Sequence, residues 1–226
     1  RLLSEVVTKD TVCLAFSSTW SESISPERIG TSSIDWIADD FFARLKETFP
    51  TIPIVAGGQM LTSYSSKMVY KHCDWHVTGF ADISFVELLN FLSNKPNRLK
   101  YKVDVNNKKC IDSNADYKVA HPNTLETVFE EYDDVKSYQP LPLEVSRGCI
   151  FQCAFCSHPF QGLKDPDAYI RSPENLANEL RRNYELFGTT RYAVLDDTFN
   201  DSIEKISRLK QAIDIAKLPD FKFVSY

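Results

Sequence analysis

The 226-residue sequence has no long hydrophobic run and no cluster of basic residues. No stretch approaches the roughly 18 consecutive apolar residues that indicate a transmembrane helix, so we expect no membrane partner. The net charge is −5 and no basic stripe is present, which argues against nucleic acid as the main partner. The chain begins Arg1-Leu2-Leu3, with neither a methionine nor a signal-peptide pattern.

Paired C-x-x-C units are also scarce among the six cysteines. Cys13, Cys73 and Cys110 stand alone, and single cysteines of this kind are typical of small buried hydrophobic positions. The remaining three, Cys149, Cys153 and Cys156, lie on one short stretch, separated by three and then two residues. Any metal chemistry of the chain is therefore expected at this stretch.

Closely spaced cysteine thiolates on a loop are typical ligands of iron–sulfur clusters. A cubane cluster has four irons, so three cysteines leave one iron open to a substrate or cofactor. Zinc prefers four ligands, commonly from paired C-x-x-C units, and His158 follows Cys156 too closely to serve the same metal. Disulfides are disfavoured because the other cysteines are scattered. We predict a [4Fe–4S] cluster on Cys149, Cys153 and Cys156, and hence a reducing, cytoplasmic environment.

Apolar runs alternate with amphipathic patterns along the chain, and this alternation is typical of an α/β fold with a parallel sheet. Ligands of such sheets bind at the carboxyl ends of the strands. In the first half, strands are expected at residues 11–16, 52–56 and 75–78, with a hairpin over 101–111. In the second half, strands are expected at 141–146, 192–195 and 221–226.

Helices are expected between the strands of the second half. Ser172-Pro173 is a helix start and Gly188 a helix stop, because proline suits the first turn and glycine the position after the last. A second helix follows, in which Ile203, Ile206, Leu209 and Ile213 are expected to face the core. The second half therefore reads as β–α–β–α–β.

The stretch from Ser146 to Cys156, SRGCIFQCAFC, resembles the signature of the radical S-adenosylmethionine (SAM) enzymes, including the aromatic Phe155 before the third cysteine. The β–α–β–α–β order resembles the first half of that family's partial (β/α)6 barrel. The resemblance implies that the open iron chelates SAM and that reductive cleavage releases a 5′-deoxyadenosyl radical. It also implies an unidentified substrate and an external electron donor, such as flavodoxin or ferredoxin.

In this family the loop after the second barrel strand lies near the SAM amino group. The matching residues here run from Asp196 to Asn200, DDTFN. The resemblance implies SAM contacts by Phe155, Asp196, Asp197, Thr198 and Asn200. The alternative for the loop is that Asn200 or Asp201 caps the following helix, and the alternative for Phe155 is plain packing.

The first half resembles the later part of the cobalamin-binding domain that precedes many radical SAM domains, through residues 54–58 (IVAGG) and 77–79 (VTG). This likeness implies cobalamin contacts at the strand ends, by Ser17, Ser18, Gly57, Gly58 and Gly79. The family's leading strand and its D-x-H-x-x-G motif are absent from the sequence. Either the chain begins after that strand, or it binds cobalamin without a histidine ligand. The alternative is a Rossmann-like scaffold whose glycines only shape turns.

We expect three regions: a Rossmann-like domain at 1–97, a hairpin and linker at 98–140, and the first half of a radical SAM barrel at 141–226. A six-stranded barrel needs more chain than follows Cys149, so the sequence predicts part of a longer protein or completion by another copy. The expected function is radical chemistry started from SAM, including cobalamin-dependent methyl transfer. The alternatives are radical chemistry without cobalamin and a non-catalytic iron–sulfur fragment.

Overall fold

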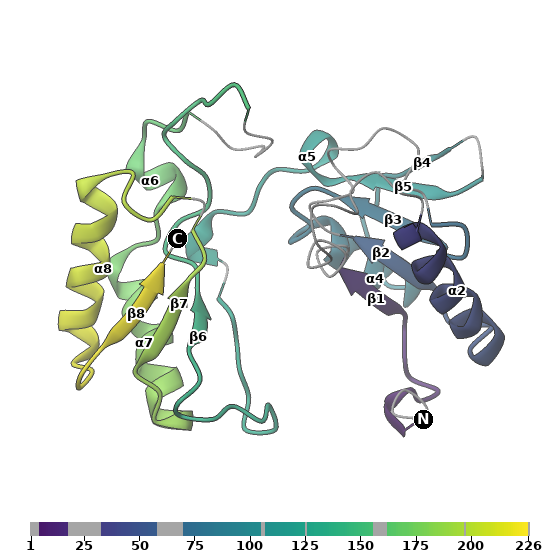
Figure 1. Cartoon of the computed structure of the whole chain (residues 1–226). Coiled ribbons are helices and arrows are strands. Elements are labelled where there is room, and N and C mark those ends of the chain that lie inside the picture. Colours follow the sequence, from purple (N-terminus) through teal and green to yellow (C-terminus); the bar gives the residue numbers. More distant parts are fainter. Residues whose placement is uncertain are drawn as a thin grey trace. The chain divides into compact units, whose positions relative to one another are not determined.

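The computed structural model of the chain describes residues 5–17, 33–57, 70–104, 107–124, 126–155, 162–196 and 198–225, and of residues 33–39 only the backbone. The chain divides into two compact units, Arg1–Val119 and Ala120–Tyr226 (Figure 1). None of the helices in these ranges combines the length and hydrophobicity that crossing a bilayer requires. Each unit is built on its own sheet, so each is described separately.

The first unit contains a five-stranded, mostly parallel sheet in the order β1-β2-β3-β5-β4. Its strands are β1 (Leu14–Ser17), β2 (Ile54–Gly57), β3 (Trp75–Thr78), β4 (Lys102–Val103) and β5 (Lys109–Asp112). Only the edge strand β4 is antiparallel to its neighbour. Gly57 lies opposite both Ser17 and Val77, so the carboxyl ends of three parallel strands meet at one edge. The expected α/β class is confirmed.

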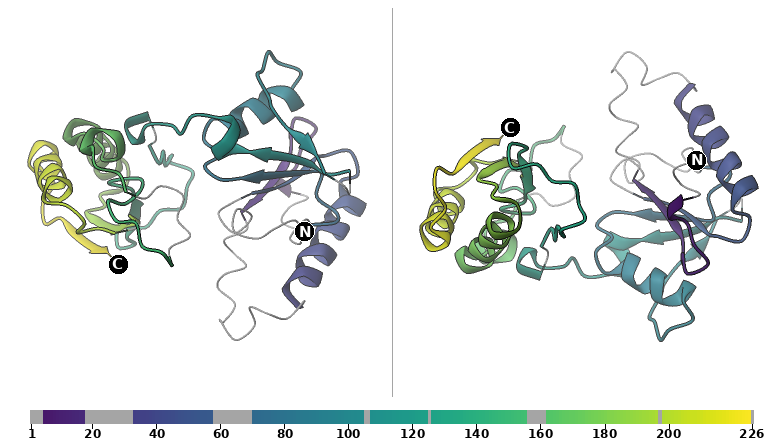
Figure 2. Two further views of the ribbon diagram at one scale, coloured as in Figure 1. Left: turned by 90° about the horizontal axis from the view of Figure 1, so that it is seen from above. Right: turned by 90° about the horizontal axis from the view of Figure 1, so that it is seen from below.

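Helices pack on both faces of this sheet (Figure 2). Helix α2 (Ser33–Thr48) places Phe42 against Ile54, whereas α4 (Ser84–Leu92) places Leu88 against Val55 on the other side. Successive residues of a strand point to opposite faces. Because both faces are covered, the strands read as continuous apolar runs rather than as alternating ones.

Within the region 98–140, expected as hairpin and linker, the residues before and after the Val119/Ala120 junction belong to different units. The predicted hairpin is present, but β5 pairs in parallel with β3 and so belongs to the first sheet. The short helix α5 (Ser113–Asp116) lies in the first unit, whereas the 3-10 turn (Pro122–Thr124) belongs to the second unit. There the Ser172 N–H donates to Asn123 Oδ1 at 2.6 Å, and Arg182 pairs with Glu126 at 2.7 Å. The two compact units therefore meet at Val119/Ala120, and the side-chain hydrogen bonds that attach residues 123 and 126 to the second unit could not be predicted from the sequence.

The second unit holds a three-stranded parallel sheet in the order β6-β7-β8. Its strands are β6 (Leu141–Leu143), β7 (Arg191–Val194) and β8 (Lys222–Ser225); its helices are α6 (Pro166–Tyr169), α7 (Pro173–Phe187) and α8 (Ile203–Ala216). The predicted start and stop of α7 are confirmed. Ser172 Oγ accepts from the Asn175 N–H, and Gly188 ends the helix at φ 64°.

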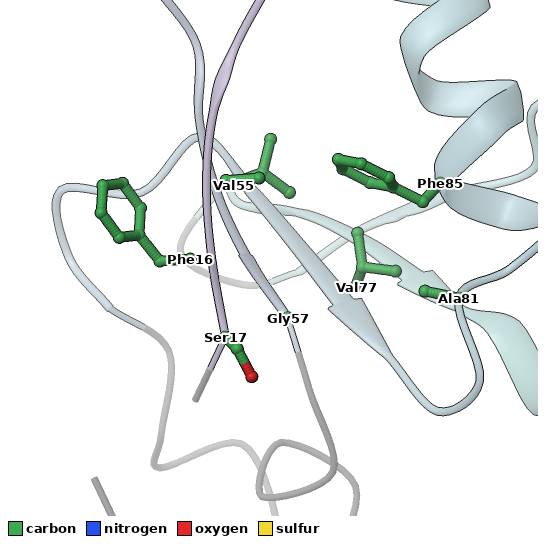
Figure 3. A pocket seen from close by; sticks show the side chains of 8 residues that line it. Phe16, Ser17, Val55, Gly57, Val77, Ala81 and Phe85 are labelled. Atoms are coloured by element: carbon green, nitrogen blue, oxygen red, sulfur yellow. The ribbon is translucent and has the colours of Figure 1, made fainter. Parts of the chain in front are cut away.

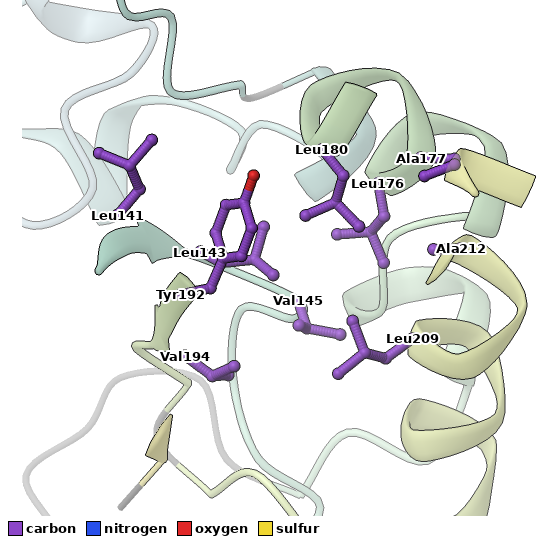
Figure 4. Close-up of a cluster of buried hydrophobic side chains, with 11 residues drawn as sticks. Leu141, Leu143, Val145, Leu176, Ala177, Leu180, Tyr192, Val194, Leu209 and Ala212 are labelled. Atoms are coloured by element: carbon purple, nitrogen blue, oxygen red, sulfur yellow. The ribbon is translucent and has the colours of Figure 1, made fainter. Parts of the chain in front are cut away.

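Helices α7 and α8 lie side by side against one face of this sheet, and their apolar side chains form its core with those of β6 and β7 (Figure 4). Leu176, Leu180 and Leu209 meet Leu143 there. In the predicted inward stripe of α8, Leu209 is buried and Ile213 packs partly buried against this core, whereas the prediction is wrong for Ile203, which is 88% exposed, and for Ile206, which is 45% exposed. The buried residues of α8 are Lys205, Leu209, Ala212 and Ala216. A lysine therefore occupies a core-facing position.

Candidate functional site

The cysteine loop follows β6 and is fixed by backbone hydrogen bonds on both sides of Cys149. Before it, the Arg147 N–H donates to the Tyr169 carbonyl at 2.9 Å. Beyond it, the Cys149 carbonyl accepts from the Leu163 N–H at 3.2 Å. Between these points Gly148 has φ 111°, a backbone conformation that side-chain-bearing residues rarely adopt. The loop therefore presents Cys149 from a defined backbone.

The Cys149 sulfur has two hydrogen-bonding neighbours. The Phe151 N–H donates to Sγ at 3.4 Å, and the Thr198 hydroxyl oxygen lies 3.4 Å from the same sulfur. Cys149 is buried, at 9% exposure. Hydrogen bonds to cysteine sulfur are one of the means by which proteins tune iron–sulfur clusters. The surroundings of Cys149 thus fit a thiolate ligand.

The other residues of the loop are more open. Cys153 is exposed, and Phe155 is 92% exposed. Cys156 lies outside the described residues. The five cysteines within them are free thiols, and no three His, Cys, Asp or Glu side chains of the described ranges gather as a metal-binding group. The complete three-cysteine arrangement remains a prediction.

Asp196 lies just beyond the end of β7, as predicted, with Leu195 between it and the strand, but its carboxylate is engaged inside the protein. Oδ1 accepts from the Val145 N–H at 2.8 Å and Oδ2 from Ser146 Oγ at 2.7 Å. Burial raises the pKa of Asp196, and the Ser146 hydroxyl and the Lys205 ammonium oppose that shift. Asp196 therefore ties the cysteine loop to the end of β7. Asp197 lies outside the described residues, and Asn200 is exposed.

Lys205 is the buried cation of this region, and the sequence analysis missed it. Its side chain is fully buried, and its ammonium nitrogen lies 2.9 Å from Asp201 Oδ1 and 3.5 Å from Asp196 Oδ2. It also donates to the Thr198 carbonyl at 2.7 Å. The capping alternative for Asn200 or Asp201 is wrong, because Ser202 Oγ caps α8 by accepting from the Lys205 N–H. The Asp201–Lys205 spacing of four residues was the available signal.

In the first unit, an apolar pocket of about 210 Å³ opens at the carboxyl ends of β1, β2 and β3 (Figure 3). Val55, Val77 and Phe85 approach one another across it. Its lining is completed by Ala15, Phe16, Ser17, Gly57 and Ala81. Two of the predicted cobalamin contacts, Ser17 and Gly57, therefore lie in one pocket, while Ser18 and Gly58 lie outside the described residues.

Gly79 has a different role from the pocket residues. Its φ is 78°, and a Cβ at this position would lie 2.5 Å from Asn114 Oδ1. That oxygen accepts from the Phe80 N–H at 3.1 Å and so fixes the turn after β3. For Gly79 the turn-shaping alternative thus has direct structural support.

Comparisons with known proteins agree with the fold. No protein family and no curated protein sequence matches the chain. Among solved structures, the chain resembles OxsB, a cobalamin-dependent SAM radical enzyme, in its structure with aqua-cobalamin and SAM bound. The TM-score is 0.52 at 15% sequence identity, and the match covers 93% of this chain but 30% of OxsB. At this identity the likeness concerns the fold alone.

Proposed function

We propose that the chain is part of a radical SAM enzyme and that Cys149, Cys153 and Cys156 bind its [4Fe–4S] cluster. One observation carries the proposal: the cysteine loop follows the first strand of a parallel β–α–β–α–β unit, and the sulfur of Cys149 is hydrogen-bonded at the end of the second strand. When bound, the cluster and SAM would supply the radical chemistry. An external one-electron donor would be required.

The chain's own residues would hold and shield this site. Asp196 fixes the start of the loop through Val145 and Ser146, and the Phe151 N–H and the Thr198 hydroxyl face the first sulfur. Phe155 and Asn200 are exposed and free of core packing, so they stay candidates for contact with SAM.

Anaerobic iron–sulfur reconstitution followed by assay for 5′-deoxyadenosine tests the proposal. We expect stoichiometric iron and sulfide, loss of the cluster absorbance in Cys149→Ala and Cys153→Ala, and retention of it in Cys110→Ala as the control. Zinc or disulfides in the anaerobically purified protein would overturn the assignment. Bound cluster without SAM cleavage would instead support a non-catalytic fragment.

We further propose that the apolar pocket of the first unit takes part in binding cobalamin. The structure of OxsB, whose fold this chain resembles, has aqua-cobalamin bound. The pocket lies at the carboxyl ends of the parallel strands, where such sheets bind ligands. At about 210 Å³ it would admit only a ring-sized apolar part of that cofactor.

A spectrum of the protein after incubation with hydroxocobalamin and gel filtration tests this part. Ala81→Phe fills the pocket and is expected to abolish retention of the cofactor, whereas Val86→Phe on the exposed side of α4 is expected to leave it unchanged. Unchanged retention in Ala81→Phe would contradict the assignment of the pocket. No retention by the unmodified protein would favour a radical SAM enzyme without cobalamin.

A further inference from the structure

We propose that the Thr198 hydroxyl donates a hydrogen bond to the Cys149 sulfur, and that Lys205 is the positioning residue that holds Thr198 in place. The family resemblance assigns Thr198 to SAM, whereas the structure places its hydroxyl 3.4 Å from Cys149 Sγ. The inference rests on the proposed function, because it treats that sulfur as a cluster ligand.

The position of Thr198 is set by the contacts of Lys205. The ammonium donates to the Thr198 carbonyl at 2.7 Å. It also contacts Asp196, two residues before, and Asp201, three residues after, at 3.5 and 2.9 Å. Three residues of this segment, Asp196, Thr198 and Asp201, therefore contact one cation, so that Thr198 is held between two further contacts of the same ammonium.

The burial of Lys205 makes this arrangement specific. Its side chain has no exposed area, and its ammonium lies 5.6 Å from the centre of the Tyr169 ring. A buried ammonium costs several kcal/mol unless it is paired and hydrogen-bonded. The carbonyl of Thr198 is one of the partners that offset this cost, so moving Thr198 would leave Lys205 poorly satisfied.

The charges of the region make the hydroxyl the suitable donor to the sulfur. Lys205 already pairs with Asp196 and Asp201 and donates to the Thr198 carbonyl, so its charge is compensated within this segment. The Thr198 hydroxyl and the Phe151 N–H are neutral dipoles that can donate to it. Hydrogen bonds to the sulfurs stabilise the more negative, reduced cluster and so raise its reduction potential.

Thr198→Val removes the donor at nearly constant shape, and Thr198→Ser keeps it. In the anaerobic apoprotein, the Cys149 S–H stretching band is isolated by difference against Cys149→Ser with Raman spectroscopy. After reconstitution, the midpoint potential is measured by redox titration. We expect Thr198→Val to shift the S–H band and to make the potential more negative, and Thr198→Ser to restore both. Thr127→Val, at an exposed threonine, is the matched control and is expected to change neither.

The role of Lys205 needs a charge-balanced variant, because Lys205→Met alone leaves Asp201 buried without its cation and can unfold the protein. The double variant Lys205→Met/Asp201→Asn removes both charges, and circular dichroism verifies its fold. We expect it to reproduce the S–H and potential shifts of Thr198→Val. A folded double variant with the values of the unmodified protein would refute the positioning role.

The outcomes separate this inference from the proposed function. An unchanged S–H band and an unchanged potential in Thr198→Val would overturn the hydrogen bond while the cluster stays in place. If the unmodified protein assembles no cluster, the proposed function and the redox role of Thr198 both fall. The S–H band still decides the contact in that case.

Discussion

The Val145 backbone N–H donates to Asp196 Oδ1 at 2.8 Å, across 51 residues of sequence. The other carboxylate oxygen accepts from the Ser146 hydroxyl at 2.7 Å. One side chain therefore joins the residues that follow β6 to those that follow β7. The beginning of the cysteine loop and the segment carrying Thr198 are thereby brought together.

Replacing Asp196 is expected to destabilise the second unit strongly. Asp196→Ala leaves the Val145 N–H without its acceptor and removes a buried partner of Lys205, and breaking a buried pair costs about 3–5 kcal/mol. Urea unfolding measures the loss. Asp214→Ala, which breaks an exposed pair with Lys210, is the control and is expected to leave the midpoint unchanged. Equal midpoints for the two variants would contradict the anchoring role of Asp196.

Two glycines at positive φ allow a matched test of the loop backbone. Gly148 has φ 111° in the cysteine loop, and Gly188 has φ 64° at the end of α7, with open space where a Cβ would stand. Alanine at either position is expected to cost about 1–2 kcal/mol of backbone strain. Iron content after reconstitution should fall in Gly148→Ala alone. If both variants load equally, the backbone at Gly148 does not govern ligand placement.

The buried phenol of Tyr192 is expected to make the folded protein less stable at alkaline pH. Burial raises its pKa to about 12, against about 10 in an unfolded chain. Between these values the unfolded state releases the phenol proton first, so stability falls as pH rises, by about 2–3 kcal/mol in total. Urea midpoints at about pH 9 and pH 11 should therefore fall less in Tyr192→Phe than in the unmodified protein. Tyr132→Phe, at a tyrosine that is 85% exposed, should behave like the unmodified protein.

A buried ion pair next to the residues that lead into the cysteine loop is suited to a double-mutant cycle. Arg171 lies 2.7 Å from Glu179, both side chains are 1% exposed, and Arg171 also donates to the Glu144 carbonyl. Burial raises the pKa of Glu179, and Arg171 opposes the shift. Glu179→Met leaves the guanidinium unpaired and should cost about 3–5 kcal/mol. Adding Arg171→Met should restore part of the loss, and a purely additive cycle would show that the two groups are not coupled.

The sequence was most informative where a local pattern determines a local structure. The strand predicted at 75–78 has the same bounds as β3. Ser172 caps the start of α7 and Gly188 caps its end, as expected. These features depend on apolar runs, proline at a helix start and glycine at a helix stop, which a short window of sequence contains. The parallel β–α–β order followed from them.

The features that were missed depend on how the elements pack. The acids that pair with Lys205 lie within nine residues of it, but the apolar spacing of α8 favoured Ile203 as a core residue, and only the packing of α8 shows that the lysine faces inward. The closeness of Cys149 and Thr198 spans 49 residues. The cysteine spacing located the candidate site, whereas the packing of its neighbours required the fold.

Two hydrogen bonds that join Asn123 to the start of α7 bear on where the polypeptide is best divided. Its side-chain oxygen holds the Ser172 N–H at the start of α7, and its carbonyl holds the Asn175 amide at 3.0 Å. A fragment that began at Leu141, the first residue of β6, would lack both hydrogen bonds of Asn123 to α7 and also Glu126, the partner of Arg182. A cut between Val119 and Ala120 would keep these hydrogen bonds within the half that carries Cys149, Cys153 and Cys156.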